Sequence, residues 1–194
     1  SRNHVLAIDN LVKEALKEAG AEQEELDAIG VTFGAGLLGA LLVGESYAKA
    51  FAYALDEPLY AVNHIRGHIA VNYIASPELE PPFVCLIASG GHTAVAYVRA
   101  HDEVEIMGST QDDACGEAFD KVARVLGLPY PGGPQIEKLA LSGSPSIALP
   151  VPFKGSDTLD FSFSGIKTAV INYVNMLKMK GNELPAADIA ASFQ

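Results

Sequence analysis

The sequence predicts an α/β protein, and three features of the chain support this. Short runs of β-branched and aromatic residues alternate with longer segments that have helical spacing. Over residues 1–77 the order is strand, helix, strand, helix, which is typical of parallel strands joined by helical crossovers. From residue 78 onward three predicted strands follow one another directly and helices come after them, so a second α/β unit is expected there.

Residues 1–77 are predicted to form the first unit. Apolar residues at helical spacing indicate a helix over residues 4–19, and Gly20 supplies a stop for it. Gly34-Ala35-Gly36 then separates a predicted strand from a long helix rich in small residues. The elements expected after the first helix are a strand over Ala28–Phe33, a helix over Leu38–Leu55, a strand over Leu59–Val62 and a helix over about 64–75.

Residues 78–194 are predicted to form the second unit. The proline-containing segment Ser76–Pro82 is the expected boundary between the two units. An antiparallel group of strands should open the second unit, and an irregular loop should interrupt its helices. The expected elements are strands over Phe83–Ala88, Thr93–Val98 and Val104–Gly108, helices over about 114–126, 133–141, 164–180 and 186–194, and the loop Leu149–Asp160.

The composition is that of a globular protein, and it argues against direct nucleic-acid binding by this chain alone. Of 194 residues, 49% are hydrophobic and 19% charged, and the net charge is −11. The nearest approach to a basic stripe, Lys167, Lys178 and Lys180, is interpreted as a solvated helix face. Cys85 and Cys115 form no metal-type or disulfide pattern, and no apolar run reaches the length of a membrane span. A cytoplasmic location is therefore expected.

His64 and His68 are the first candidate site. Residues at i and i+4 of a helix share one face, so two imidazoles at this spacing can bind one metal ion. Two exposed or capping histidines at a helix start are the alternative, and the two interpretations are weighted equally. The residues between them are Ile, Arg and Gly, so the general-base glutamate of a zinc-protease helix is absent. A third ligand is not evident in the sequence.

Two glycine-rich turns are the second group of candidates. At Ile87-Ala88-Ser89-Gly90-Gly91, free N–H groups could form an anion-binding nest, although a plain two-residue hairpin is favoured from these residues alone. Gly132 and Gly133 precede a predicted helix, and Glu137 lies one turn into it, where a carboxylate can accept hydrogen bonds from ribose hydroxyls. Glu117, Asp120 and Lys121 are interpreted as a possible surface charge cluster.

The order of these motifs along the chain resembles the TsaD family. The family includes the ATPase subunit of the archaeal and eukaryotic KEOPS complex and was formerly labelled O-sialoglycoprotein endopeptidase. The resemblance covers essentially the whole chain. It rests on His64-x3-His68, Ser89-Gly90-Gly91-His92-Thr93, Gly116-Glu117-Ala118-Phe119-Asp120-Lys121, Tyr130-Pro131-Gly132-Gly133-Pro134 and Asp160-Phe161-Ser162-Phe163-Ser164-Gly165-Ile166-Lys167-Thr168.

The resemblance implies a fold, a reaction and a set of ligands. The implied fold is actin-like (ASKHA), with two RNase H-like lobes: residues 1–77 would be the later part of the first lobe and 78–194 most of the second. The implied reaction transfers the threonylcarbamoyl group of threonylcarbamoyl-AMP to N6 of adenosine 37 in tRNA. The implied metal, iron or zinc, is bound by His64 and His68. The positions implied to contact an ATP- or adenylate-type nucleotide or substrate are Ile87, Ala88, Ser89, Gly90, Gly91, Asp120, Gly133 and Glu137.

The resemblance also implies partners and shows departures from the family pattern. A TsaB-like paralogue and a TsaE-like ATPase, or KEOPS subunits, are the implied partners, and the helices over 4–19 and 38–55 either form such an interface or pack on their own sheet. The family segments before Ser1 and after Gln194, including the acidic metal ligand, are expected to be missing, and Ala35 stands where the family usually has proline. No catalytic general base is assigned. A non-catalytic ATP-binding scaffold and a metallopeptidase are the alternatives.

Overall fold

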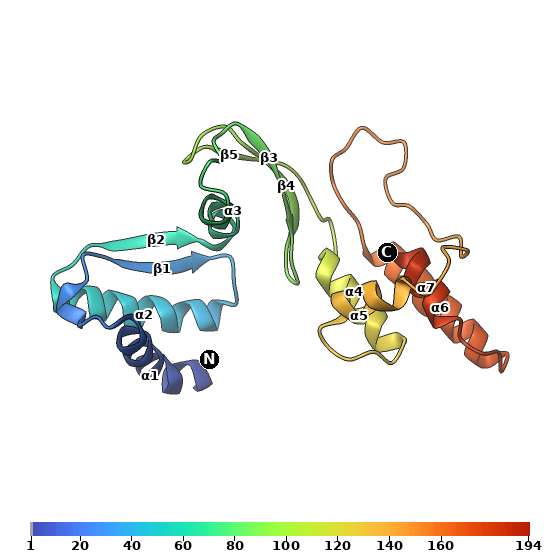
Figure 1. Cartoon of the computed structure of the whole chain (residues 1–194), viewed down its shortest axis with the longest axis horizontal. Coiled ribbons are helices and arrows are strands. Elements are labelled where there is room, and N and C mark those ends of the chain that lie inside the picture. Colours follow the sequence, from blue (N-terminus) through green and yellow to red (C-terminus); the bar gives the residue numbers. More distant parts are fainter. Residues whose placement is uncertain (1) are drawn as a thin grey trace. The chain divides into compact units, whose positions relative to one another are not determined.

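The computed structural model describes residues 2–194, and the chain divides into two compact units (Figure 1). The first unit ends at Leu79 and the second is Glu80–Gln194, so the division lies inside the Ser76–Pro82 segment. Helices and strands occur in both units, which confirms the α/β class. No helix in residues 2–194 is both long enough and apolar enough to cross a membrane.

The first unit is built on two parallel strands joined by a helix. In their register Ile29 pairs with Leu59 and Gly34 with Asn63, so the carboxyl ends of both strands lie at one edge. The helical crossover between them was expected, because parallel strands cannot be joined by a tight turn. The elements are α1 (Arg2–Ala19), the short 3-10 helix Gln23–Glu25, β1 (Ile29–Gly34), α2 (Leu38–Leu55), β2 (Leu59–Asn63) and α3 (His64–Ala75).

Packing in the first unit is light. Helix α2 lies along the strands, where Gly44 approaches Val31 closely enough that a Cβ on the glycine would be in van der Waals contact with it. Helix α1 packs on α2 and has no buried residue of its own. The buried apolar residues described in this unit are Ala48, Ala52 and Ile69.

The second unit begins with an antiparallel sheet and continues as a group of helices. The strand order is β3-β4-β5, with Ala88 paired to Thr93 at the first connection. That connection is Ser89–His92, in which the N–H of Ser89 donates to the carbonyl of His92 and Gly90 and Gly91 lie between them. The elements are β3 (Phe83–Ala88), β4 (Thr93–Val98), β5 (Val104–Ser109), α4 (Cys115–Val125), α5 (Gly132–Ala140), α6 (Ser164–Met179) and α7 (Ala186–Phe193).

The main core of the second unit lies among helices α4 to α7. Phe119 of α4 packs edge-on against Phe193 of α7, with ring centroids 5.0 Å apart. Between α5 and α6, residues 149–160 contain no helix or strand, as the sequence predicted. Each predicted element is present, with ends that differ from the prediction by two residues at most. The core residues are Ala118, Val122, Ala123, Ile136, Val170, Val174, Ile189, Ala190 and Phe193.

Candidate functional site

His64 and His68 lie on the first two turns of α3, directly after strand β2. The side chain of Asn63 caps this helix by accepting hydrogen bonds from the N–H groups of Ile65 (2.9 Å) and Arg66 (3.2 Å). Asn63 therefore does the capping that was the alternative role for the histidines. Because α3 follows β2 without a loop, the end of the strand fixes the position of His64. The helix repeat then places His68 one turn further along the same face.

The two imidazole rings converge at their outer nitrogens. The Nε2 atoms of His64 and His68 are 3.1 Å apart, and the rings meet edge to face with centroids 4.5 Å apart. Two imidazole nitrogens bound tetrahedrally to one zinc ion at about 2.05 Å would lie about 3.3 Å from each other. The pair therefore fits two positions of a metal coordination sphere with little movement.

The remaining ligands of such a metal are not evident in the described residues. Within residues 2–194, no group of three or more His, Cys, Asp or Glu side chains is arranged to hold a metal ion. The register pairs Gly34 with Asn63, so the Gly34-Ala35-Gly36 loop also lies at the carboxyl edge of the strands, where α3 begins. The Gly34–Ala35 peptide bond is cis.

The first glycine-rich turn, Ser89–His92, connects β3 and β4 in the second unit. Ser89 closes it: its N–H donates to the carbonyl of His92 (2.9 Å), and its hydroxyl accepts from the N–H of His92 (3.1 Å). Gly90 and Gly91 are exposed at its tip. Ile87 is only 4% exposed, so its backbone is the part that can face a ligand. The turn presents backbone rather than side chains, as an anion-binding nest does.

The start of α4 lies directly against this turn. The N–H of Gly116 donates to the carbonyl of Ser89 (3.1 Å), and the N–H of Cys115 donates to the hydroxyl of the buried Thr93 (2.8 Å). A Cβ at position 116 would lie 2.7 Å from the Ser89 carbonyl oxygen and 2.9 Å from the Gly90 nitrogen. Glycine is required at 116 because a larger residue would push the turn away from the helix.

The second glycine pair, Gly132 and Gly133, forms the start of the first turn of α5 and is attached to the same helix, α4. The carboxylate of Asp120 accepts a hydrogen bond from the N–H of Gly132 (2.7 Å). A Cβ at position 132 would lie 2.7 Å from the Cα of Asp120, whereas nothing lies within 4 Å of one at Gly133. Asp120 is therefore not part of the predicted surface cluster, whose ion pair is Glu117–Lys121 (2.8 Å). One of its oxygens fixes the turn, and Gly133 leaves open space beside it.

A pocket of about 310 Å³ lies where α4, α5 and the end of α7 meet. Gly116, Phe119, Gly133 and Glu137 line it together with Gln194. The structure thus brings Gly133 and Glu137, both predicted from the sequence, to one pocket. Ser89 contacts the backbone of Gly116, which lines the pocket, and Asp120 contacts the backbone of Gly132, the residue before Gly133. An aromatic wall, glycine backbone and a carboxylate are a suitable lining for a nucleoside.

Asp112 lies outside the pocket lining, and its contacts were not predicted from the sequence. Its carboxylate accepts hydrogen bonds from the hydroxyls of Ser162 and Ser164 (both 2.6 Å) and from the N–H groups of Phe163 (2.7 Å) and Ser164 (3.1 Å). Burial opposes ionisation, but these four donors outweigh it and hold the pKa of Asp112 well below its usual range. Asp112 thereby caps α6 from a segment far away in sequence.

Asp113 forms an ion-pair bridge between α6 and α4, which corrects the interpretation of Lys167. The ammonium of Lys167 contacts one carboxylate oxygen of Asp113, and Lys121 contacts the other at 3.0 Å. The bond from Lys167, opposed by burial and assisted by Lys121, lowers the pKa of Asp113. Only 17% of the Lys167 side chain is exposed, so the predicted solvated helix face is wrong at this position. Consecutive aspartates just before a helix were the available signal.

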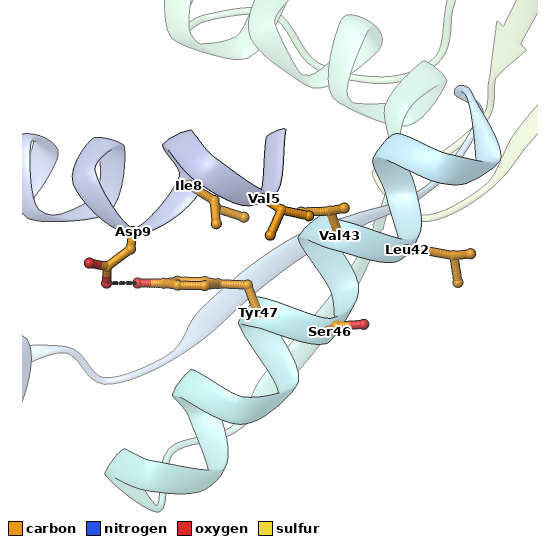
Figure 2. A pocket seen from close by; sticks show the side chains of 7 residues that line it. All are labelled: Val5, Ile8, Asp9, Leu42, Val43, Ser46 and Tyr47. Atoms are coloured by element: carbon orange, nitrogen blue, oxygen red, sulfur yellow. Dashed lines mark hydrogen bonds between the residues drawn. The ribbon is translucent and has the colours of Figure 1, made fainter. Parts of the chain in front are cut away.

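The first unit has an apolar groove between α1 and α2, shown in Figure 2. It has a volume of about 530 Å³, and at one end the hydroxyl of Tyr47 donates to Asp9 (3.2 Å). Val5 is 60% exposed and Leu42 53%. Helix α2 therefore packs on its own strands, as one alternative held, while the side facing α1 and beyond keeps apolar residues accessible to solvent.

Comparison with solved structures gives two similar chains from Pseudomonas aeruginosa. One is described as YeaZ; it is 15% identical, with a TM-score of 0.40 over 96% of this chain and 83% of that one. The other is described as an uncharacterized protein with similarity to peptidase YEAZ; it is 13% identical, with a TM-score of 0.41 over 93% of this chain and 79% of that one.

Comparison of the sequence identifies the family. Proteins named tRNA N6-adenosine threonylcarbamoyltransferase from Clostridium perfringens, Clostridium novyi and Clostridium botulinum are 58%, 56% and 55% identical over all of this chain. The chain spans 57–58% of the length of these curated relatives. A family model described as TsaD, tRNA N6-adenosine threonylcarbamoyltransferase, matches residues 1–194. From its histidine pair to its glycine turns, this chain belongs to the TsaD family.

Proposed function

We propose that the protein of which this chain is a part transfers the threonylcarbamoyl group from threonylcarbamoyl-AMP to N6 of adenosine 37 in tRNA. The proposal rests on family membership together with one geometric observation, the two Nε2 atoms 3.1 Å apart on α3. The chain spans 58% of its Clostridium perfringens relative, so the activity is proposed for the whole protein. Its two units are proposed to belong to the two lobes of an actin-like fold.

His64 and His68 are proposed to hold a divalent metal, iron or zinc, through their Nε2 atoms. When bound, such a metal supplies a Lewis acid that can polarise the carbamoyl carbonyl. Each histidine would have to be neutral at Nε2 to coordinate, which fixes its proton on Nδ1. The exposure of both side chains leaves room for further ligands from elsewhere in the protein.

The second unit is proposed to hold the adenylate part of the substrate. Glu137 would accept hydrogen bonds from ribose hydroxyls, and the open space beside Gly133 would admit the ribose against backbone. The exposed amides of Gly90 and Gly91 would donate to a phosphate or to developing negative charge. Asp120, whose one oxygen accepts from the N–H of Gly132, is proposed to contact the nucleotide through its other carboxylate oxygen. We assign no general base, because an adenylate is already an activated donor.

The proposed partners follow the same reasoning. With a net charge of −11 and no basic stripe, this chain is a poor binding surface for tRNA, so a partner is proposed to help hold it. A TsaB-like paralogue would cover the exposed apolar groove between α1 and α2, and a TsaE-like ATPase or KEOPS subunits would complete the assembly. The site of action is proposed to be the cytoplasm, and a scaffold role is disfavoured by the converging histidines.

The decisive experiment is complementation of cells depleted of their own TsaD-family protein. The full-length protein should restore threonylcarbamoyladenosine in tRNA, measured by mass spectrometry of digested nucleosides. His64→Ala and His68→Ala variants should each reduce the product at least about 100-fold while the protein stays folded. His101→Ala, at an exposed histidine between β4 and β5, is the matched control and should restore full modification. Normal modification by a His64→Ala/His68→Ala double variant would refute the proposed role of the pair.

A further inference from the structure

A group of polar contacts in the second unit has no role in the proposed reaction. It consists of Asp112 and Asp113 with their partners Ser162, Ser164 and Lys167, and we refer to it as the aspartate clip. The clip joins the residues just before α4 to the start of α6, about 50 positions later in the chain. Such a long loop closure costs conformational entropy, which these bonds must offset.

The contacts next to the clip make the junction more extensive. The N–H of Ser109 donates to the carboxylate of Asp160 (3.0 Å), and the N–H of Gln111 donates to the carbonyl of Phe161 (2.9 Å). A Cβ at Gly108 would overlap the carbonyl of Leu159, so the two segments are as close as backbone allows. Residues 159–161, just before α6, therefore lie beside the end of β5 and the residues that follow it.

From the clip, the contacts continue along α4. Lys121, which binds Asp113 at 3.0 Å, also binds Glu117 at 2.8 Å, so the first two turns of α4 are tied to the residues that precede it. At the start of α4, Gly116 touches the Ser89 turn, and one turn later Asp120 holds the N–H of Gly132. One helix therefore sets the spacing between the two glycine turns.

We propose that Asp112 and Asp113 are positioning residues of the nucleotide site: they hold α4 in the orientation that sets the distance between the Ser89–His92 turn and the Gly132–Gly133 turn. This inference rests on the proposed nucleotide site. Neither aspartate lines the pocket, so neither touches the ligand. Their effect reaches the ligand through Gly116 and Asp120, and a small displacement of these contacts is enough to weaken binding.

A second consideration separates this role from plain stabilisation. Another face of α4 is held by the core through Ala118 and Val122, both 0% exposed. Loss of the clip therefore leaves the core contacts of α4 in place and frees its polar side. We expect α4 to remain helical while the two turns lose their fixed spacing.

The test uses the full-length protein and AMP as the probe, with affinity measured by calorimetry. Asp113→Asn should weaken AMP binding about tenfold. The control is Asp188→Asn, the same substitution at a carboxylate that accepts a hydrogen bond from the N–H of Ser144 (2.8 Å) in the same unit but away from both turns. The Asp188→Asn variant should change AMP affinity less than about twofold, even if its melting temperature falls as far as that of Asp113→Asn. Hydrogen exchange should rise in residues 88–92 and 130–133 of Asp113→Asn alone.

A second pair of variants tests the bridge itself. Lys167→Met should also weaken AMP binding, and the double variant should bind no more weakly than Asp113→Asn alone, because the ion pair lost in Lys167→Met is one of the two that Asp113→Asn disrupts. If Asp113→Asn does not fold, Ser162→Ala tests the proposal instead, because Asp112 then keeps three of its four hydrogen-bond donors. The Ser162→Ala variant should weaken AMP binding about threefold.

These variants distinguish failure of the positioning role from failure of the proposed nucleotide site. Equal AMP affinity in Asp113→Asn and Asp188→Asn at equal melting temperature overturns the positioning role. If the wild-type protein binds no AMP, the proposed nucleotide site fails instead. The clip is then judged by exchange alone: unchanged exchange in the two turns of Asp113→Asn overturns the inference as well.

Discussion

The two units of this chain place their candidate sites in different ways. In the first unit the histidine pair is set by local structure, a strand that runs into a capped helix, and helix α1 nearby buries none of its residues. In the second unit the pocket residues come from α4, α5 and the residue that follows α7, and all three of these helices contribute to the core. A site of the first kind depends on a few neighbouring residues, whereas one of the second kind depends on the packing of the whole unit.

As a result, substitutions at the candidate site should affect stability less in the first unit than in the second. Changes at exposed residues such as His64 are expected to leave the fold unaffected, because little packing is lost, so that their effect on activity tests the proposed metal site alone. Changes on α4 or α5 alter both, because one face of each helix is core and the other lines the pocket. The comparison can be tested from its largest expected effect to its smallest.

The largest effect is expected for Ile136→Ala in the second unit. Ile136 is 0% exposed in the core, and removal of such a side chain leaves a cavity that costs about 2–5 kcal/mol of unfolding free energy. Val5→Ala in the first unit, at 60% exposure, should cost less than about 0.5 kcal/mol. Urea unfolding followed by circular dichroism measures both. Comparable losses for the two variants would show that the first unit also depends on a tight core.

An intermediate effect with a defined pH dependence is expected for Asp112→Asn. Asparagine keeps one acceptor oxygen for the two N–H groups but has no charge and no second oxygen to accept from the hydroxyls of Ser162 and Ser164, so the variant should lose about 1 kcal/mol at neutral pH. Because the pKa of Asp112 is lowered in the folded state, its ionisation stabilises the protein above the ordinary value of 3.8, and this contribution is lost as the pH falls below it. The difference between wild type and variant should therefore narrow between about pH 5 and pH 3.

Urea unfolding midpoints across that pH range measure this effect. Asp157→Asn, in the exposed part of the irregular loop, is the matched control and should follow the wild type throughout. A constant difference between wild type and Asp112→Asn from about pH 5 to pH 3 would mean that the four hydrogen bonds do not favour the ionised carboxylate in solution.

The smallest effect on stability is expected for the histidine pair. In the presence of a chelator, the His64→Ala/His68→Ala variant should unfold within about 0.5 kcal/mol of the wild type, since both side chains are exposed. Added zinc or iron should then stabilise the wild type and leave the variant unchanged. Thermal melts of the full-length protein with and without metal check this. A large loss in the chelator would show that the pair contributes to the fold itself.

Most of the fold was predictable from local patterns. The helix Leu38–Leu55 and the strands Phe83–Ala88 and Thr93–Val98 have the predicted bounds, because helical and alternating periodicity are properties of consecutive residues. The glycine turn between β3 and β4 was predictable as a turn, but the contact between the Ser89 hydroxyl and His92 was not, because the glycine pair alone does not indicate it.

The site was predictable only where spacing along one element was enough. His64 and His68 converge because a helix repeats every 3.6 residues, so their separation follows from the sequence. Lys167 was interpreted wrongly because its partner, Asp113, lies 54 positions away. The charge pattern of a single helix cannot show which distant carboxylate will face it.

The sequence by itself therefore determined the α/β class, the order of elements, the histidine pair and the two glycine turns. These depend on backbone preferences and on residues within one or two turns of each other. Only the tertiary structure decided that Asp120 holds Gly132, that Gly116 touches the Ser89 turn, and that Asp112 caps α6. Each of these is a contact between separate elements, and such contacts are fixed by packing of the core rather than by local pattern.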